Sequence, residues 1–180
     1  MAINTPEDIL EFMKKNIKYG WLDINNSEHI GNMKDFRRLY RTSSIEEILK
    51  HGLGTCIEQV WLMKYLLDGI GIENKMFCTR VYEPNEFNNL DAEERMHCFI
   101  LYYLDDKVWQ IEHPNWERIG IYCYDSEEQA IKEINDIYEK MSGGIARPVT
   151  QFYKVEPNLS FREFNAYINS LDKYFDVKKL

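Results

Sequence analysis

The middle of the chain carries a run of strand-like segments joined by hairpin-like connections. Four segments are rich in β-branched and aromatic residues and have no helical pattern between them, namely 75–82, 96–104, 107–112 and 119–124. Strands connected in this way pair in antiparallel fashion. Because helices are expected before and after this run in the sequence, the pattern predicts an α+β fold built on an antiparallel sheet.

Capping residues mark where the helices begin. Thr5 precedes Pro6 and stands three residues before Asp8, which is the arrangement of a capping box with proline at the first helical position. Comparable patterns predict helices at 44–50, 55–69, 126–141 and 160–171. The segment 19–35 looks irregular, and 149–155 is expected to form a last strand.

Composition and charge narrow the class of protein. The 180 residues contain no linker or repeat, which predicts a single domain over 1–180. The net charge of −8 argues against a nucleic-acid partner, because phosphates would be repelled. An apolar run of about 18 residues, which would predict a membrane span, is absent. Since the N-terminus lacks a signal-peptide pattern and the four cysteines form no CxxC pair, we expect free thiols and a cytoplasmic location.

Cys56 stands where a helix is expected to begin. Thr55 is the predicted N-cap and Glu58 its capping-box partner, so Cys56 falls in the first turn. Unpaired backbone N–H groups and the positive end of the helix dipole favour the thiolate there, which is the nucleophilic form. Gly52 and Gly54 leave room for a substrate carbonyl. A buried, unreactive cysteine is the alternative interpretation.

His97 opens the apolar strand 97–103, directly after the charged loop 83–95. A histidine at the mouth of a strand is held rigidly and stays reachable, as a general base requires. A hydrogen-bonded structural histidine is the alternative. The acidic stretch 91–94 is expected to be a solvated loop, and its position also permits a place on the rim of an active cleft.

The third group of the site follows from a turn. Asp105-Asp106 is expected to form a two-residue hairpin turn that pairs its two flanking residues. That register makes Glu112 a diagonal neighbour of His97 on one sheet face and points His113 to the other face. A carboxylate there can fix the imidazole tautomer and stabilise the imidazolium. A three-residue loop would exchange Glu112 for His113, so both residues stay open for this position.

These residues resemble a known family. Gly54-Thr55-Cys56 enters a helix, His97 starts a strand, and Trp109-Gln110-Ile111-Glu112 ends the next strand. This order of motifs is similar to that of the transglutaminase-like superfamily. The resemblance covers roughly 52–116 and implies a papain-like fold, a catalytic helix packed on an antiparallel sheet, a Cys-His-acid triad and no obligatory cofactor. The acid of the family is commonly Asp followed directly by Pro, whereas His113 here separates Glu112 from Pro114. Glu in this role resembles bacterial members.

The resemblance also implies where an oxyanion would bind. The backbone N–H of Cys56 is one donor by geometry. In animal transglutaminases an indole N–H from an upstream aromatic residue assists, which makes Trp21 of Tyr19-Gly20-Trp21 the candidate here. Ordinary packing of Trp21 is the alternative.

The expected activity is cysteine-dependent acyl transfer or hydrolysis at a carboxamide or peptide carbonyl of a protein or peptide substrate. Transglutaminase, deamidase and peptidase reactions share this chemistry, and the acyl acceptor, an amine or water, stays open. A catalytically idle domain of the same fold that binds other proteins is the alternative.

A metal site is a weaker interpretation of the same residues. A zinc ion held by Cys56, Cys98, His97 and His113 is disfavoured, because Cys98 and His97 are adjacent and point to opposite faces of a strand. No metal is therefore expected. Cys78 and Cys123 lie in strand patterns and are expected in the core.

Overall fold

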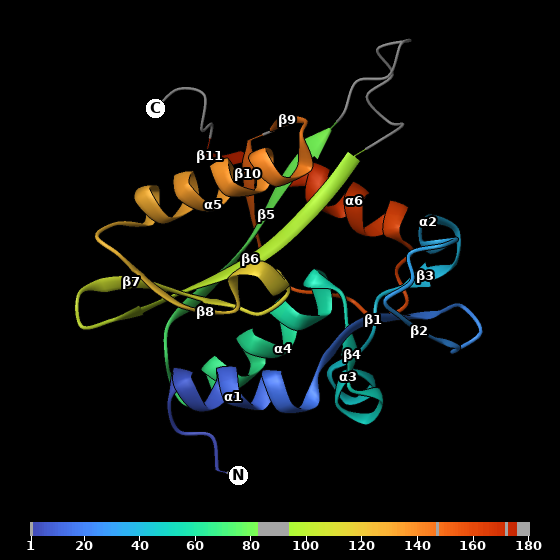
Figure 1. The fold of residues 1–180 in the computed structure, drawn as a ribbon, viewed down its shortest axis with the longest axis horizontal. Coiled ribbons are helices and arrows are strands. Elements are labelled where there is room, and N and C mark those ends of the chain that lie inside the picture. Colours follow the sequence, from blue (N-terminus) through green and yellow to red (C-terminus); the bar gives the residue numbers. More distant parts are fainter. Residues whose placement is uncertain (1, 83–93, 147, 172, 176–180) are drawn as a thin grey trace.

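The computed structural model describes residues 2–82, 94–146, 148–171 and 173–175 (Figure 1). Most of the expected loop 83–95, and all but Glu94 of the acidic stretch 91–94, lies outside the described residues. The helices are α1 (Pro6–Asn16), α2 (Phe36–Leu39), α3 (Ile45–His51), α4 (Cys56–Gly69), η1 (Trp116–Arg118, a 3-10 helix), α5 (Glu127–Ser142) and α6 (Phe161–Ser170). The strands are β1 (Lys18–Asp23), β2 (Glu28–Ile30), β3 (Tyr40–Arg41), β4 (Leu53–Gly54), β5 (Asn74–Tyr82), β6 (Glu94–Leu104), β7 (Lys107–Glu112), β8 (Gly120–Tyr124), β9 (Ile145–Ala146), β10 (Val149–Phe152) and β11 (Lys173–Phe175).

The larger sheet is built around β6. Among the described residues its strands lie in the order β11-β10-β5-β6-β7-β8, and β9 pairs with the far end of β5. Every one of these pairings is antiparallel. The predicted α+β fold with an antiparallel sheet is therefore confirmed.

Helices cover both faces of this sheet. α4 and α1 pack on one face, where Cys98 and Ile100 of β6 join their apolar core. α5 packs on the other face, against Phe99 and Leu101. Figure 1 shows β6 running between α5 and α4. Because side chains alternate along a strand, His97 belongs to the α5 face, in series with Phe99.

The turn between β6 and β7 sets the register of the hairpin. Leu104 pairs with Lys107, so the predicted two-residue turn is confirmed. Asp105 and Asp106 both have positive φ, 53° and 57°, as the two central residues of a type I′ turn do. This register carries Glu112 to the level of Phe99, one diagonal step from His97.

A second, small sheet corrects the expectation that 19–35 is irregular. β1 pairs with β2 and β3 in antiparallel fashion and with β4 in parallel fashion. The second half of β1 is buried without alternation, and β2 is only three residues long. Such strands leave no period-2 pattern in the sequence, since pairing with distant segments stabilises them.

The helix starts agree with the capping signals. Complete capping boxes are present at Thr5, Ser44 and Thr55, and the Ser126 hydroxyl accepts the backbone N–H of Gln129. These local contacts fix where α4 begins and therefore where Cys56 lies. Within the described part of the chain, none of the helices is long and apolar enough to cross a membrane.

Candidate active site

Cys56 is the first residue of α4, and local hydrogen bonds hold the turn that contains it. The Thr55 hydroxyl accepts the N–H of Ile57 at 3.3 Å, and the Glu58 carboxylate accepts the N–H of Thr55 at 2.9 Å. A Cβ on Gly54 would lie 2.8 Å from the Cβ of Glu58. The chain can enter the helix this closely because residue 54 is glycine.

The sulfur of Cys56 lies against the backbone of β6, in the part of that strand that extends beyond the β6–β7 pairing. That pairing runs as far as Ile100 opposite Ile111, and further along the strand Sγ is 3.8 Å from the carbonyl oxygen of Met96. The thiol and the backbone N–H of Cys98 both donate toward the sulfur. The sulfur thus lies beside backbone groups of β6 to which a neighbouring strand would otherwise hydrogen bond.

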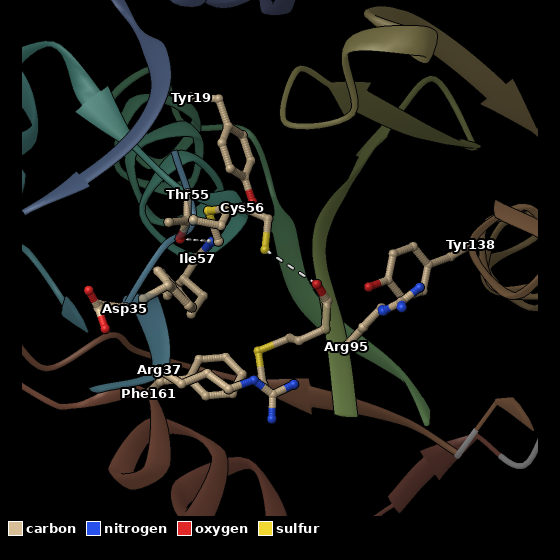
Figure 2. Close-up of a pocket in the computed structure, with 12 residues that line it drawn as sticks. Tyr19, Asp35, Arg37, Thr55, Cys56, Ile57, Arg95, Tyr138 and Phe161 are labelled. Carbon is tan, nitrogen blue, oxygen red and sulfur yellow. Dashed lines mark hydrogen bonds between the residues drawn. The ribbon is translucent and has the colours of Figure 1, made fainter. Parts of the chain in front are cut away.

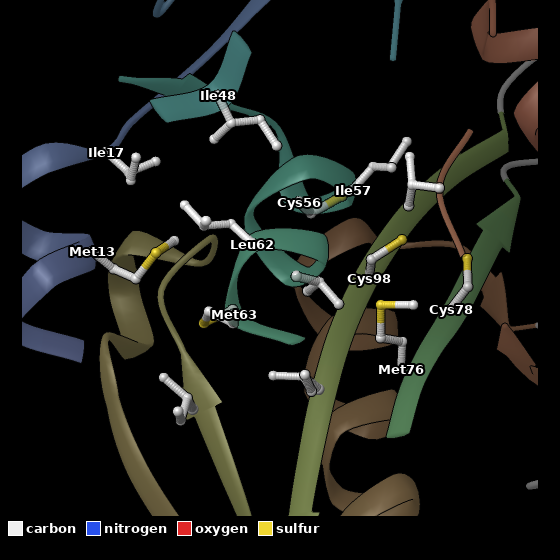
Figure 3. Packing of buried hydrophobic residues seen from close by; sticks show 14 of the residues in the cluster. Met13, Ile17, Ile48, Cys56, Ile57, Leu62, Met63, Met76, Cys78 and Cys98 are labelled. Atoms are coloured by element: carbon white, nitrogen blue, oxygen red, sulfur yellow. The ribbon is translucent and has the colours of Figure 1, made fainter. Parts of the chain in front are cut away.

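Hydrogen bonding and charge favour the ionised form of Cys56. The hydrogen bond from the Cys98 thiol lowers the pKa of Cys56, and the attraction of His97 lowers it further, against the effect of burial. Burial, followed by the interaction with Cys56, raises the pKa of Cys98. Cys98 therefore keeps its proton and acts as the donor. Figure 3 shows both cysteines between the first turn of α4 and the sheet.

His97 is 8% exposed and is paired with a carboxylate. Its Nε2 lies 3.1 Å from Oε2 of Glu112. Burial lowers the pKa of His97, but the charge of Glu112 and this hydrogen bond outweigh burial, and the charge of Cys56 adds to them, so the pKa is raised overall. The ring of Tyr138, on α5, stacks on the imidazole with ring centroids 5.3 Å apart. These contacts hold the ring in one orientation and leave Nδ1 unused by Glu112.

Glu112 is buried in a shell of donors. The Nε2 of Gln110 donates to the oxygen that also pairs with His97, at 2.8 Å, and the backbone N–H of Asn115 donates to Oε1 at 3.0 Å. Such donors stabilise a buried carboxylate as the anion. The structure thus brings His97 and Glu112 together, in the diagonal relationship expected from the turn.

His113 points to the opposite side of β7. Its Nδ1 lies 2.6 Å from Oε1 of Gln59 on α4, and Nε2 of Gln59 donates to the carbonyl oxygen of Gly54 at 2.7 Å. Burial lowers the pKa of His113, which keeps the ring neutral. Of the two residues left open by the sequence, Glu112 is the one in contact with His97.

Two adjoining cavities open onto Cys56. The larger has a volume of about 450 Å³, and Arg37 and Arg95 are among the residues that line it. The smaller has a volume of about 260 Å³ and is lined by His97 as well as by Cys56. Figure 2 shows the sulfur of Cys56 and the hydroxyl of Tyr138 facing the larger cavity. Cys56 and His97 thus share the wall of the smaller cavity.

Trp21, the expected oxyanion donor, is engaged elsewhere. Its indole N–H donates to the carbonyl oxygen of Asn32 at 2.8 Å, and its ring is 2% exposed and stacked on His29 with 3.9 Å between centroids. This N–H is therefore not available to a substrate, and the expectation for Trp21 has to be corrected. Tyr19, two residues earlier on β1, lines both cavities instead.

Three residues belong to the site although the sequence did not single them out. Tyr19 belongs to the stretch Tyr19-Gly20-Trp21, which the sequence indicated near the site, but Trp21 was the residue chosen from it. Cys98 follows His97, and alternation indicated only that the two point apart. Tyr138 is one of many residues on an amphipathic helix, and no local pattern distinguishes it.

The other cysteines differ in exposure. Cys78 is buried as expected, whereas Cys123 is exposed, so its predicted place in the core was wrong. Cys123 lies on β8, the last strand in the order β11-β10-β5-β6-β7-β8 of the described sheet. Within the described ranges, no group of three or more His, Cys, Asp or Glu side chains is placed to hold a metal ion.

Comparisons with solved structures give distant likenesses. No family model and no curated protein matches the chain. Among solved structures, arylamine N-acetyltransferase C from Bacillus anthracis is 17% identical with a TM-score of 0.37, covering 62% of this chain and 42% of that one. The arylamine N-acetyltransferase (BACCR)NAT3 from Bacillus cereus, which has a Cys-His-Glu catalytic triad, is 18% identical with a TM-score of 0.37 over 62% and 41%. The chain spans less than half of either protein, and likenesses this distant establish neither a family nor an activity for it.

Proposed function

We propose that this protein is a cysteine-dependent acyl transferase or hydrolase in which Cys56 is the nucleophile, His97 the proton carrier and Glu112 the residue that orients His97. The contact between His97 Nε2 and Glu112 Oε2, beside a cysteine at a helix N-terminus, is the observation that carries the proposal. The resemblance to the transglutaminase-like superfamily supports the same roles for the same residues.

In the first half-reaction, the Cys56 sulfur attacks an acyl carbon and a C–S bond forms. The thiol proton passes to His97, whose raised pKa lets it hold that proton beside the anionic Glu112. His97 then donates the proton to the leaving amine as the C–N bond breaks. The product is a thioester on Cys56.

In the second half-reaction, an amine or a water molecule attacks the thioester. His97 accepts the proton of the attacking group, and the C–S bond breaks to return the thiolate of Cys56. A lowered thiol pKa makes that sulfur a better leaving group. The same residues therefore serve cross-linking, deamidation and peptide hydrolysis, with a protein or peptide carboxamide as the substrate.

Thiol labelling tests the nucleophile without a known substrate. Iodoacetamide at neutral pH should alkylate Cys56 faster than a model thiol and faster than the exposed Cys123, as followed by peptide mapping with mass spectrometry. Cys56→Ala should abolish acyl transfer from glutamine-containing peptides to water or to a primary amine. Cys123→Ala is the matched control and should leave both reactions intact.

The labelling also separates an enzyme from an idle binding domain. Alkylation of Cys56 no faster than that of a model thiol would contradict the nucleophile and favour a domain that only binds other proteins. Fast alkylation together with acyl transfer to amine or water would support the proposal, and the ratio of the two products identifies the acceptor.

A further inference from the structure

Tyr19 is brought to Cys56 by the pairing of two strands. β1 and β4 pair in parallel, with Tyr19 opposite Gly54, and α4 begins two residues after Gly54. Figure 2 shows the hydroxyl of Tyr19 pointing toward Cys56 at the wall of the larger cavity. Tyr19 also lines the smaller cavity, together with His97.

The Tyr19 oxygen accepts a backbone hydrogen bond that the helix cap does not use. The Thr55 hydroxyl accepts the N–H groups of Ile57 and of the third helical residue, Glu58. The N–H of Cys56 is not part of that cap, and hydrogen bonding from it lowers the pKa of Tyr19, against the larger effect of burial. A phenol and a backbone N–H that lie side by side at a helix N-terminus can both donate to an anionic oxygen.

The same spot is where negative charge would develop in the proposed reaction. When the Cys56 sulfur bonds to an acyl carbon, the carbonyl oxygen becomes an oxyanion close to the backbone N–H of the same residue. A phenol can accept a hydrogen bond in the free protein and donate one when an oxyanion takes over the N–H. Tyr19 lines both cavities, so its hydroxyl borders the space that the carbonyl oxygen would enter.

We propose that the hydroxyl of Tyr19 is the second oxyanion donor, acting with the backbone N–H of Cys56. This inference rests on the proposed function and takes the role first expected of Trp21. The O–H donates to the oxygen that becomes negative as the C–S bond forms, and it keeps its own proton throughout. Tyr19 is therefore a catalytic residue, because it touches the reacting atoms.

The protonation of Tyr19 agrees with a donor role. Burial of its hydroxyl end, followed by the charge of Cys56, raises the pKa of Tyr19 above its ordinary value. At neutral pH the phenol is therefore protonated, which is the form that can donate.

The test compares two reactions of the same sulfur. Acylation by p-nitrophenyl acetate passes through an oxyanion, whereas alkylation by iodoacetamide displaces iodide at a saturated carbon and forms none. Tyr19→Phe should slow acylation on the order of 10²-fold, as loss of one oxyanion donor does. The alkylation rate should stay nearly unchanged. Tyr65→Phe, on the exposed side of α4, is the matched control and should alter neither rate.

Each other outcome overturns the inference in a distinct way. An unchanged or faster acylation in Tyr19→Phe would mean that the hydroxyl only fills the space that the substrate oxygen must enter. Equal slowing of both reactions would mean that Tyr19 acts on the thiolate and not on an oxyanion. Slow alkylation of the unaltered protein would contradict the nucleophile itself, and so the proposed function, before any variant is considered.

Discussion

The thiol of Cys98 is hydrogen bonded to the sulfur of Cys56 from the strand residue that directly follows His97. Two neighbours on β6 thus act on one sulfur from opposite sides of the strand. Cys98 supplies a hydrogen bond from the α4 face, and His97 supplies electrostatic attraction. A thiol donor is weak, yet it is buried beside the sulfur that it stabilises.

Cys98 is expected to tune the reactivity of Cys56. Cys98→Ala removes a donor to the thiolate, so the pKa of Cys56 should rise toward its ordinary value. Alkylation of Cys56 by iodoacetamide should then slow in neutral and mildly acidic solution and recover at alkaline pH. Cys98→Ser keeps a donor of similar size and should retain the low pKa. Equal pH–rate profiles for the alanine variant and the unaltered protein would contradict this role.

The pH dependence of labelling follows from the same contacts. Since the pKa of Cys56 is lowered, its thiolate persists as the pH falls through the range where an ordinary thiol, with a pKa of about 8.5, becomes protonated. The alkylation rate of Cys56 should therefore stay on its plateau at pH values where that of glutathione has declined. A profile that coincides with glutathione would show that the helix N-terminus, Cys98 and His97 do not stabilise the anion.

Glu112 is expected to matter for rate more than for folding. Glu112→Gln keeps the shape of the side chain but removes the anion that stabilises protonated His97. By analogy with removal of the acid from a serine triad, acylation should fall on the order of 10²-fold or more. The thiolate absorbance of Cys56, titrated in the ultraviolet, should shift to higher pH. A variant with unchanged rate and titration would indicate that Cys56 and His97 work as a dyad.

His113 is expected to matter for stability more than for rate. Its folded pKa is lowered, so the unfolded chain binds the proton more readily, and stability is lost as the pH falls below the ordinary histidine value of about 6.5. His113→Gln should therefore weaken the loss of stability in mildly acidic solution, as followed by urea unfolding at several pH values. His97, whose pKa is raised, contributes the opposite slope and should be compared at the same time. An unaltered pH dependence in His113→Gln would contradict the buried, neutral state.

The hairpin turn offers a stability test away from the cavities. Asp105 and Asp106 both occupy the left-handed region, where asparagine and glycine are the favoured pair. The double substitution Asp105→Asn and Asp106→Gly should raise the free energy of unfolding by about 1 kcal/mol, because an L-residue with a Cβ is strained in that region. The acylation rate should not change. A destabilised variant would mean that the aspartates make contacts in the turn that outweigh the strain.

Much of the fold could be predicted because its signals are local. The capping boxes at Thr5, Ser44 and Thr55 lie within one helical turn, and the hairpin turn depends on two adjacent residues. The small sheet was missed because β1 pairs with β3 and β4, which follow it by more than ten residues, because its hairpin partner β2 is only three residues long, and because the burial of β1 shows no alternation.

The candidate site likewise has parts that local sequence signals predict and parts that they do not. The helix position of Cys56 and the pairing of His97 with Glu112 follow from local signals and one register. Their catalytic roles stay predictions. Trp21 and Tyr19 could not be told apart, because which of two nearby aromatic residues reaches a helix N-terminus depends on the packing of β1 against β4.

The hairpin turn also limits where the sequence can accept an inserted residue. Surface loops usually accept insertions, because their ends tolerate small displacements. One residue added at Asp105-Asp106 would slide β7 past β6 and exchange the faces of Glu112 and His113, which changes the partner of His97 from an acid to an imidazole. An exposed loop at one end of the sheet therefore constrains the chemistry at the other, and this stretch should resist insertion even though nothing in the turn approaches a substrate.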